Sequence, residues 1–244
     1  MINNLGTPGY RCRPAALDGF LQVAYRTRQG KQAKRIGAMA GKTFRLLGLS
    51  GSIRRASNCK AVLETIREMV GADTVVTNFD LEPIPPYNQD HDNDKGWPPP
   101  IRALRKEVIE ADGIIAVTPE YNHGMSGILK NAIDWVSRPG YESILKDKVV
   151  LTISVSNRGG IRAQNQMHTT FLSTVCRITP GRQIVVVEPA KKIIDGRVTD
   201  EQMLRVILRG VDTMLEEICL FQGLPKRVDA AAEARKAGPR PKGD

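Results

Sequence analysis

Residues 45–62, with the sequence RLLGLSGSIRRASNCKAV, decide the fold of this chain. They open with an apolar run, Leu46-Leu47-Gly48-Leu49, which is typical of a strand buried in a parallel sheet. Small and polar residues follow at 50–58, and a helical pattern starts near Cys59. A strand, a polar loop and a helix N-terminus in this order predict an anion site. The loop and first-turn N–H groups lack intrahelical acceptors, and the helix dipole favours negative charge there.

The side chains of this loop favour phosphate as the anion. Ser52, Ser57 and Asn58 add hydroxyl and amide donors, and Arg54 adds a charge-assisted contact that suits phosphate geometry. The simpler alternative is that Ser57 or Asn58 only caps the helix. Capping needs one such residue and does not need Arg54, so we interpret the stretch as a phosphate-binding loop.

The charge of the chain lies mainly at its two ends. The net charge is +10, and the length of 244 residues suits one domain with appendages. Residues 1–45 hold nine Lys or Arg against Asp18 alone, and residues 226–244 hold six basic and three acidic residues. The residues between are therefore close to neutral, which argues against nucleic-acid binding by the core.

Cysteine and histidine usage restricts the chemistry further. The four cysteines are widely spaced, without a C-x-x-C pair, and the three histidines show no ligand spacing. We therefore expect a reducing, cytoplasmic location, no disulfide framework and no metal site. No apolar run reaches the roughly 18 residues of a membrane span.

Composition divides the chain into three parts. We expect residues 1–43 to form a basic, disordered extension, with Met39 as the natural start. Residues 44–223 form the predicted domain, and residues 224–244 a disordered C-terminal tail rich in Ala, Lys, Pro and Gly.

Strand and helix patterns alternate five times along the predicted domain. The predicted strands are 46–49, 74–79, 113–118, 148–155 and 183–187, and the predicted helices are 59–70, 101–111, 128–137, 161–176 and 200–222, the last capped by Thr199. This alternation predicts an α/β fold with a doubly wound, five-stranded parallel sheet and helices on both faces.

Three polar loops then meet at one edge of the sheet. Loops 50–58, 119–127 and 154–160 follow the first, third and fourth strands, and ligands of such sheets bind beyond the strand carboxyl ends. The crevice suits a phosphate-bearing ligand with a flat head group. A redox cofactor would supply its own chemistry, consistent with a sequence that shows no catalytic triad, metal cluster or carboxylate pair.

Three motifs give the chain a specific resemblance. They are Gly51-Ser52-Ile53-Arg54 with Ser57, TPEYN at 118–122 followed by Gly127 and LKNAIDW at 129–135, and Gly159-Gly160 with RAQ at 162–164. Over about residues 44–222 the sequence resembles the NADPH-dependent FMN reductase family. This flavodoxin-like group includes chromate reductases and soluble quinone reductases.

The resemblance implies FMN as cofactor and NADPH or NADH as hydride donor. The flavin N5 would carry the chemistry, so no side chain is assigned as catalytic. The residues implied in FMN binding are Ser50, Ser52, Arg54, Ser57, Asn58 and Cys59 near the phosphate, Pro119, Glu120, Tyr121 and Asn122 beside the ring, and Ser154, Ser156, Gly159 and Gly160 at its pyrimidine end. The implied donor and substrate pocket comprises Tyr121, His123 and Arg138.

The implied function is electron transfer to a small-molecule acceptor such as a quinone, an azo compound, free flavin or chromate. The resemblance also implies a homodimer or homotetramer. Two alternatives stay open: a flavodoxin-type electron carrier without its own substrate pocket, and a flavin-free interaction module on the same fold. Cys59 lies at a helix N-terminus, where a thiolate is favoured, but we assign it no catalytic role.

Overall fold

The computed structural model describes residues 43–93 and 96–223. The predicted N-terminal extension up to residue 42, Met39 within it, and the predicted tail at 224–244 lie outside the described residues. None of the helices in the described ranges is long and apolar enough to cross a membrane.

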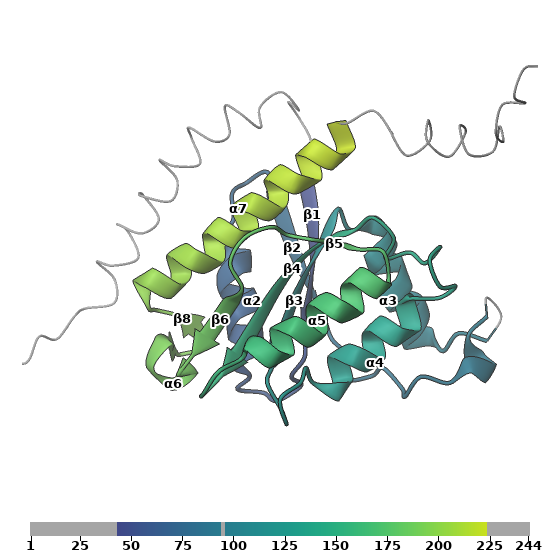
Figure 1. Ribbon diagram of the computed structural model, residues 1–244, viewed down its shortest axis with the longest axis horizontal. Coiled ribbons are helices and arrows are strands. Elements are labelled where there is room, and N and C mark those ends of the chain that lie inside the picture. The colour runs from purple at the N-terminus through teal and green to yellow at the C-terminus, as the bar shows by residue number, and fades with distance from the viewer. Residues whose placement is uncertain (1–42, 94–95, 224–244) are drawn as a thin grey trace, which may run out of the picture. The chain divides into compact units, whose positions relative to one another are not determined.

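A parallel sheet forms the centre of the described domain (Figure 1). Its strands are β1 (Phe44–Ser50), β2 (Thr74–Phe79), β3 (Gly113–Pro119), β4 (Val149–Ser156), β5 (Arg177–Ile178) and β6 (Ile184–Val187). They pair in the order β2-β1-β3-β4, and both β5 and β6 then pair with β4. The predicted α/β fold with a doubly wound parallel sheet is confirmed.

The fifth position of the sheet is filled by two short segments instead of one strand. β5 pairs with the start of β4, through Val149 and Val150, and β6 pairs with its end. Pro180 and Gly181 lie between the two segments. Proline has no N–H to donate to the ladder, and Gly181 has a φ of +130°, so the chain leaves the sheet there and returns.

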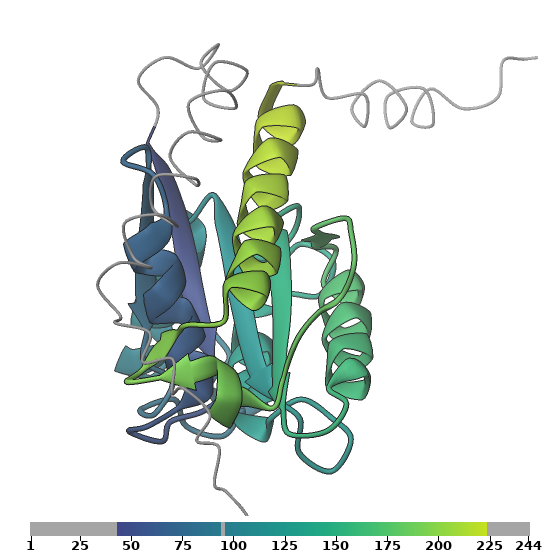
Figure 2. The same cartoon turned by 90° about the vertical axis from the view of Figure 1, so that its left-hand side faces the viewer.

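Helices cover both faces of the sheet (Figure 2). They are α2 (Asn58–Met69), α3 (Pro99–Glu110), α4 (Gly127–Val136), α5 (Ile161–Ser173) and α7 (Glu201–Gly223), besides the one-turn elements η2 (Gln89–His91) and α6 (Pro189–Lys192). Buried residues of α3, α4 and α5 share one apolar core with β1, β3 and β4. The other face is covered by α2 and by α7, where Met214 packs over Gly113.

Two helix ends differ from the sequence prediction. The helix predicted to reach Cys176 stops at Ser173, because Val175 adopts a left-handed φ of +63°. The cap of α7 is Asp200, whose Oδ1 accepts from Met203 N at 2.7 Å. Thr199, the predicted cap, instead donates its hydroxyl to the Lys192 carbonyl.

A small antiparallel pair, β7 (Ile193–Ile194) with β8 (Arg197–Val198), was not predicted.

Candidate functional site

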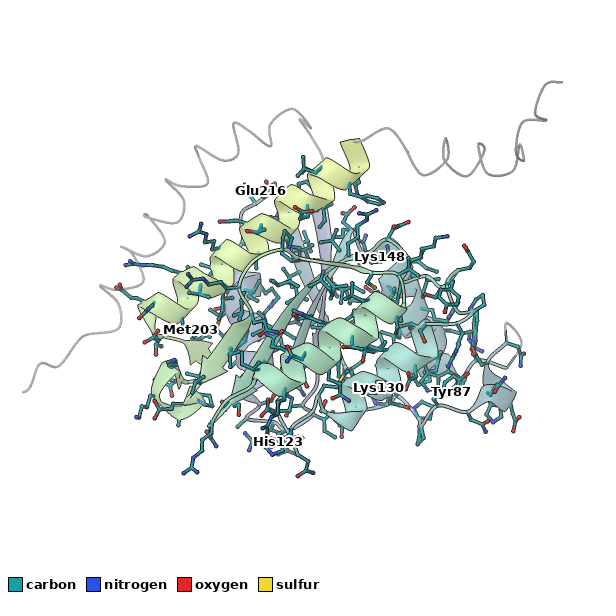
Figure 3. The ribbon with its side chains drawn as sticks, in the orientation of Figure 1. Tyr87, His123, Lys130, Lys148, Met203 and Glu216 are labelled. Atoms are coloured by element: carbon teal, nitrogen blue, oxygen red, sulfur yellow. The ribbon has the colours of Figure 1, made fainter. Side chains whose placement is uncertain are left out.

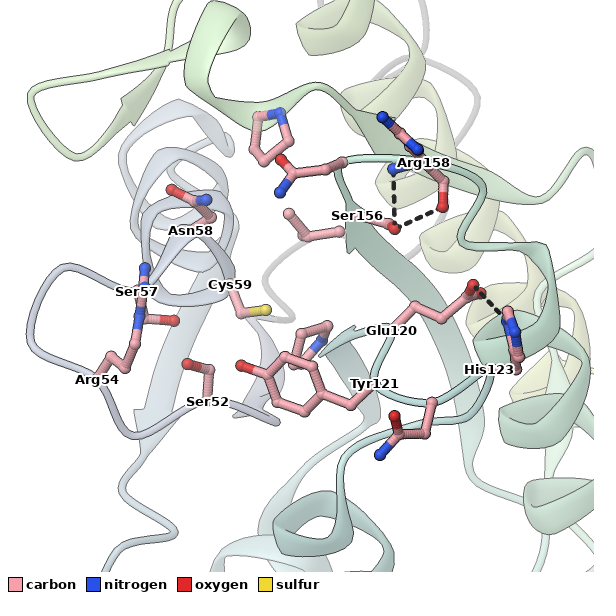
Figure 4. A pocket seen from close by; sticks show the side chains of 15 residues that line it. Ser52, Arg54, Ser57, Asn58, Cys59, Glu120, Tyr121, His123, Ser156 and Arg158 are labelled. Atoms are coloured by element: carbon pink, nitrogen blue, oxygen red, sulfur yellow. Dashed lines mark hydrogen bonds and ion pairs between the residues drawn. The ribbon is translucent and has the colours of Figure 1, made fainter.

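A pocket of about 580 Å³ opens at the carboxyl edge of the sheet (Figure 4). Its walls come from the segments that follow β1, β3, β4 and β6. The residues that line it are Ser52, Arg54, Ser57, Asn58, Cys59, Pro119, Glu120, Tyr121, Asn122, His123, Val155, Ser156, Asn157, Arg158 and Pro189. The three loops that the sequence placed at one edge therefore do meet.

Hydrogen bonds to β3 and within the loop itself fix the loop after β1. The Gly51 N–H donates to the Val117 carbonyl at 2.7 Å, and the buried Ser50 hydroxyl donates to Ser52 O at 3.0 Å. Ser50 also accepts from the Ser52 N–H, so its side chain supports the loop and does not line the pocket. Residues 55 and 56 form a turn that pairs the Ser57 N–H with the Arg54 carbonyl. Within the described part of the chain, the backbone N–H groups of residues 53–56, 58 and 59 find no acceptor. A bound anion would satisfy such donors.

Ser57 caps α2, as the simpler interpretation held, and it lines the pocket as well. Its hydroxyl accepts from Lys60 N at 3.3 Å. The Arg54 side chain bends back so that Nη2 donates to the Ala56 carbonyl at 2.8 Å. The loop therefore combines a capped helix N-terminus with a pocket-lining guanidinium.

Cys59 lines the pocket but differs from the expectation of a favoured thiolate. Its side chain is buried, and burial raises the pKa of the Cys59 thiol to about 12, outweighing the hydrogen bond to Ser57 and the charge of Arg54. Desolvation disfavours the charged form more strongly than the helix N-terminus favours it. Cys59 is therefore a protonated, apolar wall at neutral pH.

A tight hairpin follows β3 and carries the aromatic side of the pocket. Tyr121 and Gly124 exchange both backbone hydrogen bonds, at 3.0 and 2.9 Å. Asn122 and His123 form the turn between them with left-handed φ values of +48° and +65°. Two consecutive positive φ angles match a type I′ turn. This turn leaves Tyr121 with 55% of its surface exposed at the pocket.

Helix α5 fixes this hairpin in place. Glu120 Oε2 accepts from Ala163 N at 3.1 Å, so a residue of the β3 loop caps α5, whose own N-cap position is Gly160. Arg162 Nη1 lies 2.6 Å from His123 Nδ1, and Met125 N donates to Gln166 Oε1 at 2.6 Å. Because a guanidinium only donates, His123 Nδ1 is the acceptor in that contact.

The loop after β4 closes the opposite wall. The Ser156 hydroxyl donates to Arg158 O at 2.9 Å and accepts from Arg158 N at 3.3 Å. Gly160 then adopts a φ of +107°, and a Cβ there would lie 2.9 Å from Ser154 Oγ. Ser154 is fully buried beneath the loop and does not line the pocket. Neither Gly159 nor Gly160 lines it, so they shape the loop that carries Ser156 and Arg158.

Arg138 is the predicted site residue that the structure places elsewhere. It lines a separate cavity of about 350 Å³ with Tyr87 and Trp97, and its Cζ lies 5.5 Å from the Tyr87 ring centre. Figure 3 shows Tyr87 well away from His123. The reason is helix length: α4 starts beside the pocket at Gly127, and its ten residues carry the chain about 15 Å away before Arg138.

Four pocket residues were missed in the sequence: Val155, Asn157, Arg158 and Pro189. Asn157 and Arg158 belong to the predicted loop 154–160, but only the serines and glycines of that loop were assigned to the cofactor site. Pro189 follows β6, and the rule that ligands bind beyond strand carboxyl ends would have included it.

Across residues 43–93 and 96–223, no three His, Cys, Asp or Glu side chains group as a metal site requires.

The sheet order and the pocket at the carboxyl edge define a flavodoxin-like fold. A sequence model of the NADPH-dependent FMN reductases matches residues 44–191. The chain belongs to the NADPH-dependent FMN reductase family. It is thus an oxidoreductase that uses FMN as its cofactor and NAD(P)H as its hydride donor, and this family assignment does not favour the electron-carrier alternative.

Individual relatives agree with the family match. An NAD(P)H-dependent FMN reductase of Pseudomonas aeruginosa is 33% identical over 175 residues, which span 70% of this chain and 93% of the relative. A quinone reductase of Escherichia coli K12 is 36% identical over 165 residues, or 66% of this chain and 88% of the relative. Among solved structures, FerB, a flavoenzyme NAD(P)H:(acceptor) oxidoreductase from Paracoccus denitrificans, superposes with a TM-score of 0.63. It is 27% identical and the match covers 72% of this chain and 97% of FerB.

Proposed function

We propose that the FMN phosphate binds at the loop of residues 52–59. The observation that carries this proposal is the set of backbone N–H groups at 53–56, 58 and 59 without an acceptor among the described residues, at the N-terminus of α2. Arg54 adds a positive charge, and Ser52 and Ser57 add hydroxyls. This donor set fits a phosphate group, and about 580 Å³ is within the usual range for a cofactor pocket.

The flavin ring would lie between the hairpin after β3 and the loop after β4. On one side Pro119, Glu120, Tyr121 and Asn122 would contact it, and on the other Ser156 would approach its pyrimidine end. Gly159 and Gly160 would let the backbone of that loop come close to the ring, with Ser154 beneath them. His123 and Tyr121 would border the place where donor and acceptor bind.

When bound, FMN supplies the hydride-accepting and hydride-donating chemistry at its N5. The residues of this chain orient the reactants and provide backbone N–H groups that stabilise negative charge. No side-chain acid or base is required of them, and the burial that keeps the Cys59 thiol protonated removes a competing nucleophile.

We further propose that the acceptor is a quinone, with azo compounds, free flavin and chromate as other candidates. The name of the E. coli relative, a quinone reductase, supports the first of these. A homodimer or homotetramer, a cytoplasmic location and an FMN-binding reductase domain at residues 44–223 complete the proposal. They rest on the family resemblance, on the spaced cysteines and on the composition of the two ends.

Absorbance spectroscopy of the purified protein tests this function. We expect a flavin spectrum that bleaches when NADPH is added without oxygen and returns when a quinone is added. Arg54→Gln should weaken FMN binding about tenfold, because it removes one charge-assisted contact. Arg182→Gln is the matched control, because Arg182 is an exposed arginine in the link between β5 and β6 and does not line the pocket. A bound flavin that NADPH cannot reduce would instead indicate an electron carrier, and failure to bind added FMN would refute the site itself.

A further inference from the structure

Two arginines line the pocket, and they lie on different sides of it. Figure 4 shows Arg54 beside Ser57 and Asn58, and Arg158 across the opening above Ser156. FMN carries one phosphate, which the proposed function places at the Arg54 loop. Arg158 is therefore a second pocket cation for which the cofactor offers no second phosphate.

The backbone of Arg158 is held firmly while its side chain stays exposed. Both its N–H and its carbonyl bond to the Ser156 hydroxyl, at 3.3 and 2.9 Å, and two left-handed glycines follow. No carboxylate in the described part of the chain lies within ion-pair distance of Arg158. A positioned, exposed guanidinium without a carboxylate partner is available to an anion from solution.

The surrounding charges favour an anion at this rim. Arg162 follows four residues later, is exposed, and donates to Nδ1 of His123 and not to a carboxylate. Glu120 is the nearby acid: its Oε2 accepts from Ala163 N, and its Oε1 lies 3.9 Å from His123 Nδ1. Glu188, next to the pocket residue Pro189, is paired with Lys191. Among the described residues, the two guanidinium groups of Arg158 and Arg162 therefore face the single carboxylate of Glu120, and the rim keeps a net positive charge.

We propose that Arg158 binds a phosphate of the hydride donor, with Arg162 adding to the local positive field. NADPH offers two such groups, its 2′-phosphate and its pyrophosphate, whereas NADH offers the pyrophosphate alone. The inference rests on the proposed function, because it takes the first loop as the FMN phosphate site. It makes Arg158 a specificity-determining residue at the donor end of the pocket.

The experiment compares FMN-loaded wild type with Arg158→Ala, using NADPH and NADH with one quinone at saturation. We expect the KM for the donor to rise at least about tenfold, with kcat nearly unchanged, because one charge-assisted contact to bound donor is lost. A rise for NADPH alone identifies the 2′-phosphate as the ligand, and an equal rise for both nucleotides identifies the pyrophosphate. Arg162→Ala should raise the same KM by a smaller factor, and added salt should reduce every difference.

An equilibrium readout and a control complete the test. Binding of 2′-AMP and of ADP-ribose to the FMN-loaded protein, followed by calorimetry, should weaken in Arg158→Ala in the same pattern as the KM values. Arg182→Ala makes the same charge change in the link between β5 and β6, outside the pocket lining, and should alter neither measurement. Unchanged KM values and unchanged nucleotide binding in Arg158→Ala overturn the inference. A wild-type protein that binds no FMN or oxidises neither nucleotide overturns the proposed function instead.

Discussion

Gly51 directly precedes the proposed phosphate loop, and replacing it with alanine tests how tightly that loop is packed. A Cβ at this position would lie 2.6 Å from Ser126 Oγ, 2.9 Å from Thr118 Oγ1 and 3.2 Å from Thr118 Cα. The Thr118 contact includes backbone of the central strand β3, so the loop must move and not the strand. We expect Gly51→Ala to shift the backbone N–H groups of residues 53–56, 58 and 59 that the proposal assigns to phosphate.

The size of the effect follows from overpacking and from the size of the domain. Forcing an extra methyl into a packed site costs about 1–3 kcal/mol. For a domain of this length each kcal/mol lowers Tm by roughly 2–4 °C, so the apo-protein should melt about 2–12 °C lower. FMN should bind about tenfold more weakly, the equivalent of one displaced charge-assisted hydrogen bond.

Gly127→Ala is the matched control, because a Cβ at Gly127 meets nothing within 4 Å. Both substitutions reduce the freedom of the unfolded chain equally, so the difference between the two variants isolates the clash. Thermal melts of the apo-proteins and FMN fluorescence titrations provide the two measurements, with FMN absent from the melts because a ligand raises Tm. If Gly51→Ala and Gly127→Ala behave alike in both, the packing inferred around Gly51 is wrong.

Three further predictions concern His123, His168 and Cys59. Because the φ of His123 is +65°, His123→Gly should be more stable than His123→Ala by about 1 kcal/mol, the reverse of the usual order, and equal melting temperatures would contradict the left-handed turn. Burial lowers the pKa of His168, whose Nε2 lies 2.8 Å from Thr152 Oγ1, below the ordinary histidine value of 6.5. The unfolded chain then binds more protons below pH 6.5, so wild type should lose stability on acidification more steeply than His168→Gln, and parallel melting profiles from pH 5 to 8 would refute this. With its thiol pKa raised to about 12, Cys59 should resist iodoacetamide at pH 8 in the native protein and react after unfolding, which peptide mapping by mass spectrometry can follow.

The central strands and their polar edge were predictable because each depends on local sequence. β1, β3 and β4 are buried on both faces, so they read as unbroken apolar runs such as GIIAV at 113–117. The carboxyl ends of parallel strands all lie at one edge of the sheet, so the loops that follow them meet there whatever the details of side-chain packing. Ser52, Arg54 and Ser57 could therefore be assigned to one pocket with Glu120 and Tyr121, from far along the chain.

Other features depended on contacts between distant segments, and the sequence contained no local sign of them. Glu120 caps a helix that begins forty-one residues later, and its partner Ala163 N is a backbone group that any residue would provide. The fifth strand is divided in two because β5 pairs with the start of β4 and β6 pairs with its end, with Pro180 between the two segments. Arg138 lies outside the pocket because the length of α4, and not its sequence pattern, determines the distance of that residue from the pocket.

The sequence by itself thus determined the fold class, the edge of the sheet that carries the pocket and the residue types that favour phosphate there. These follow from periodicity and loop chemistry, which act over a few neighbouring residues. Only the tertiary structure decided the protonation of Cys59, the supporting hydrogen bonds of Ser50, the burial of Ser154, and the position of the Arg158 guanidinium away from every carboxylate of the described residues. Burial, orphaned charge and hydrogen-bond pairing are properties of the space around a side chain, and that space is filled by residues far away in the chain.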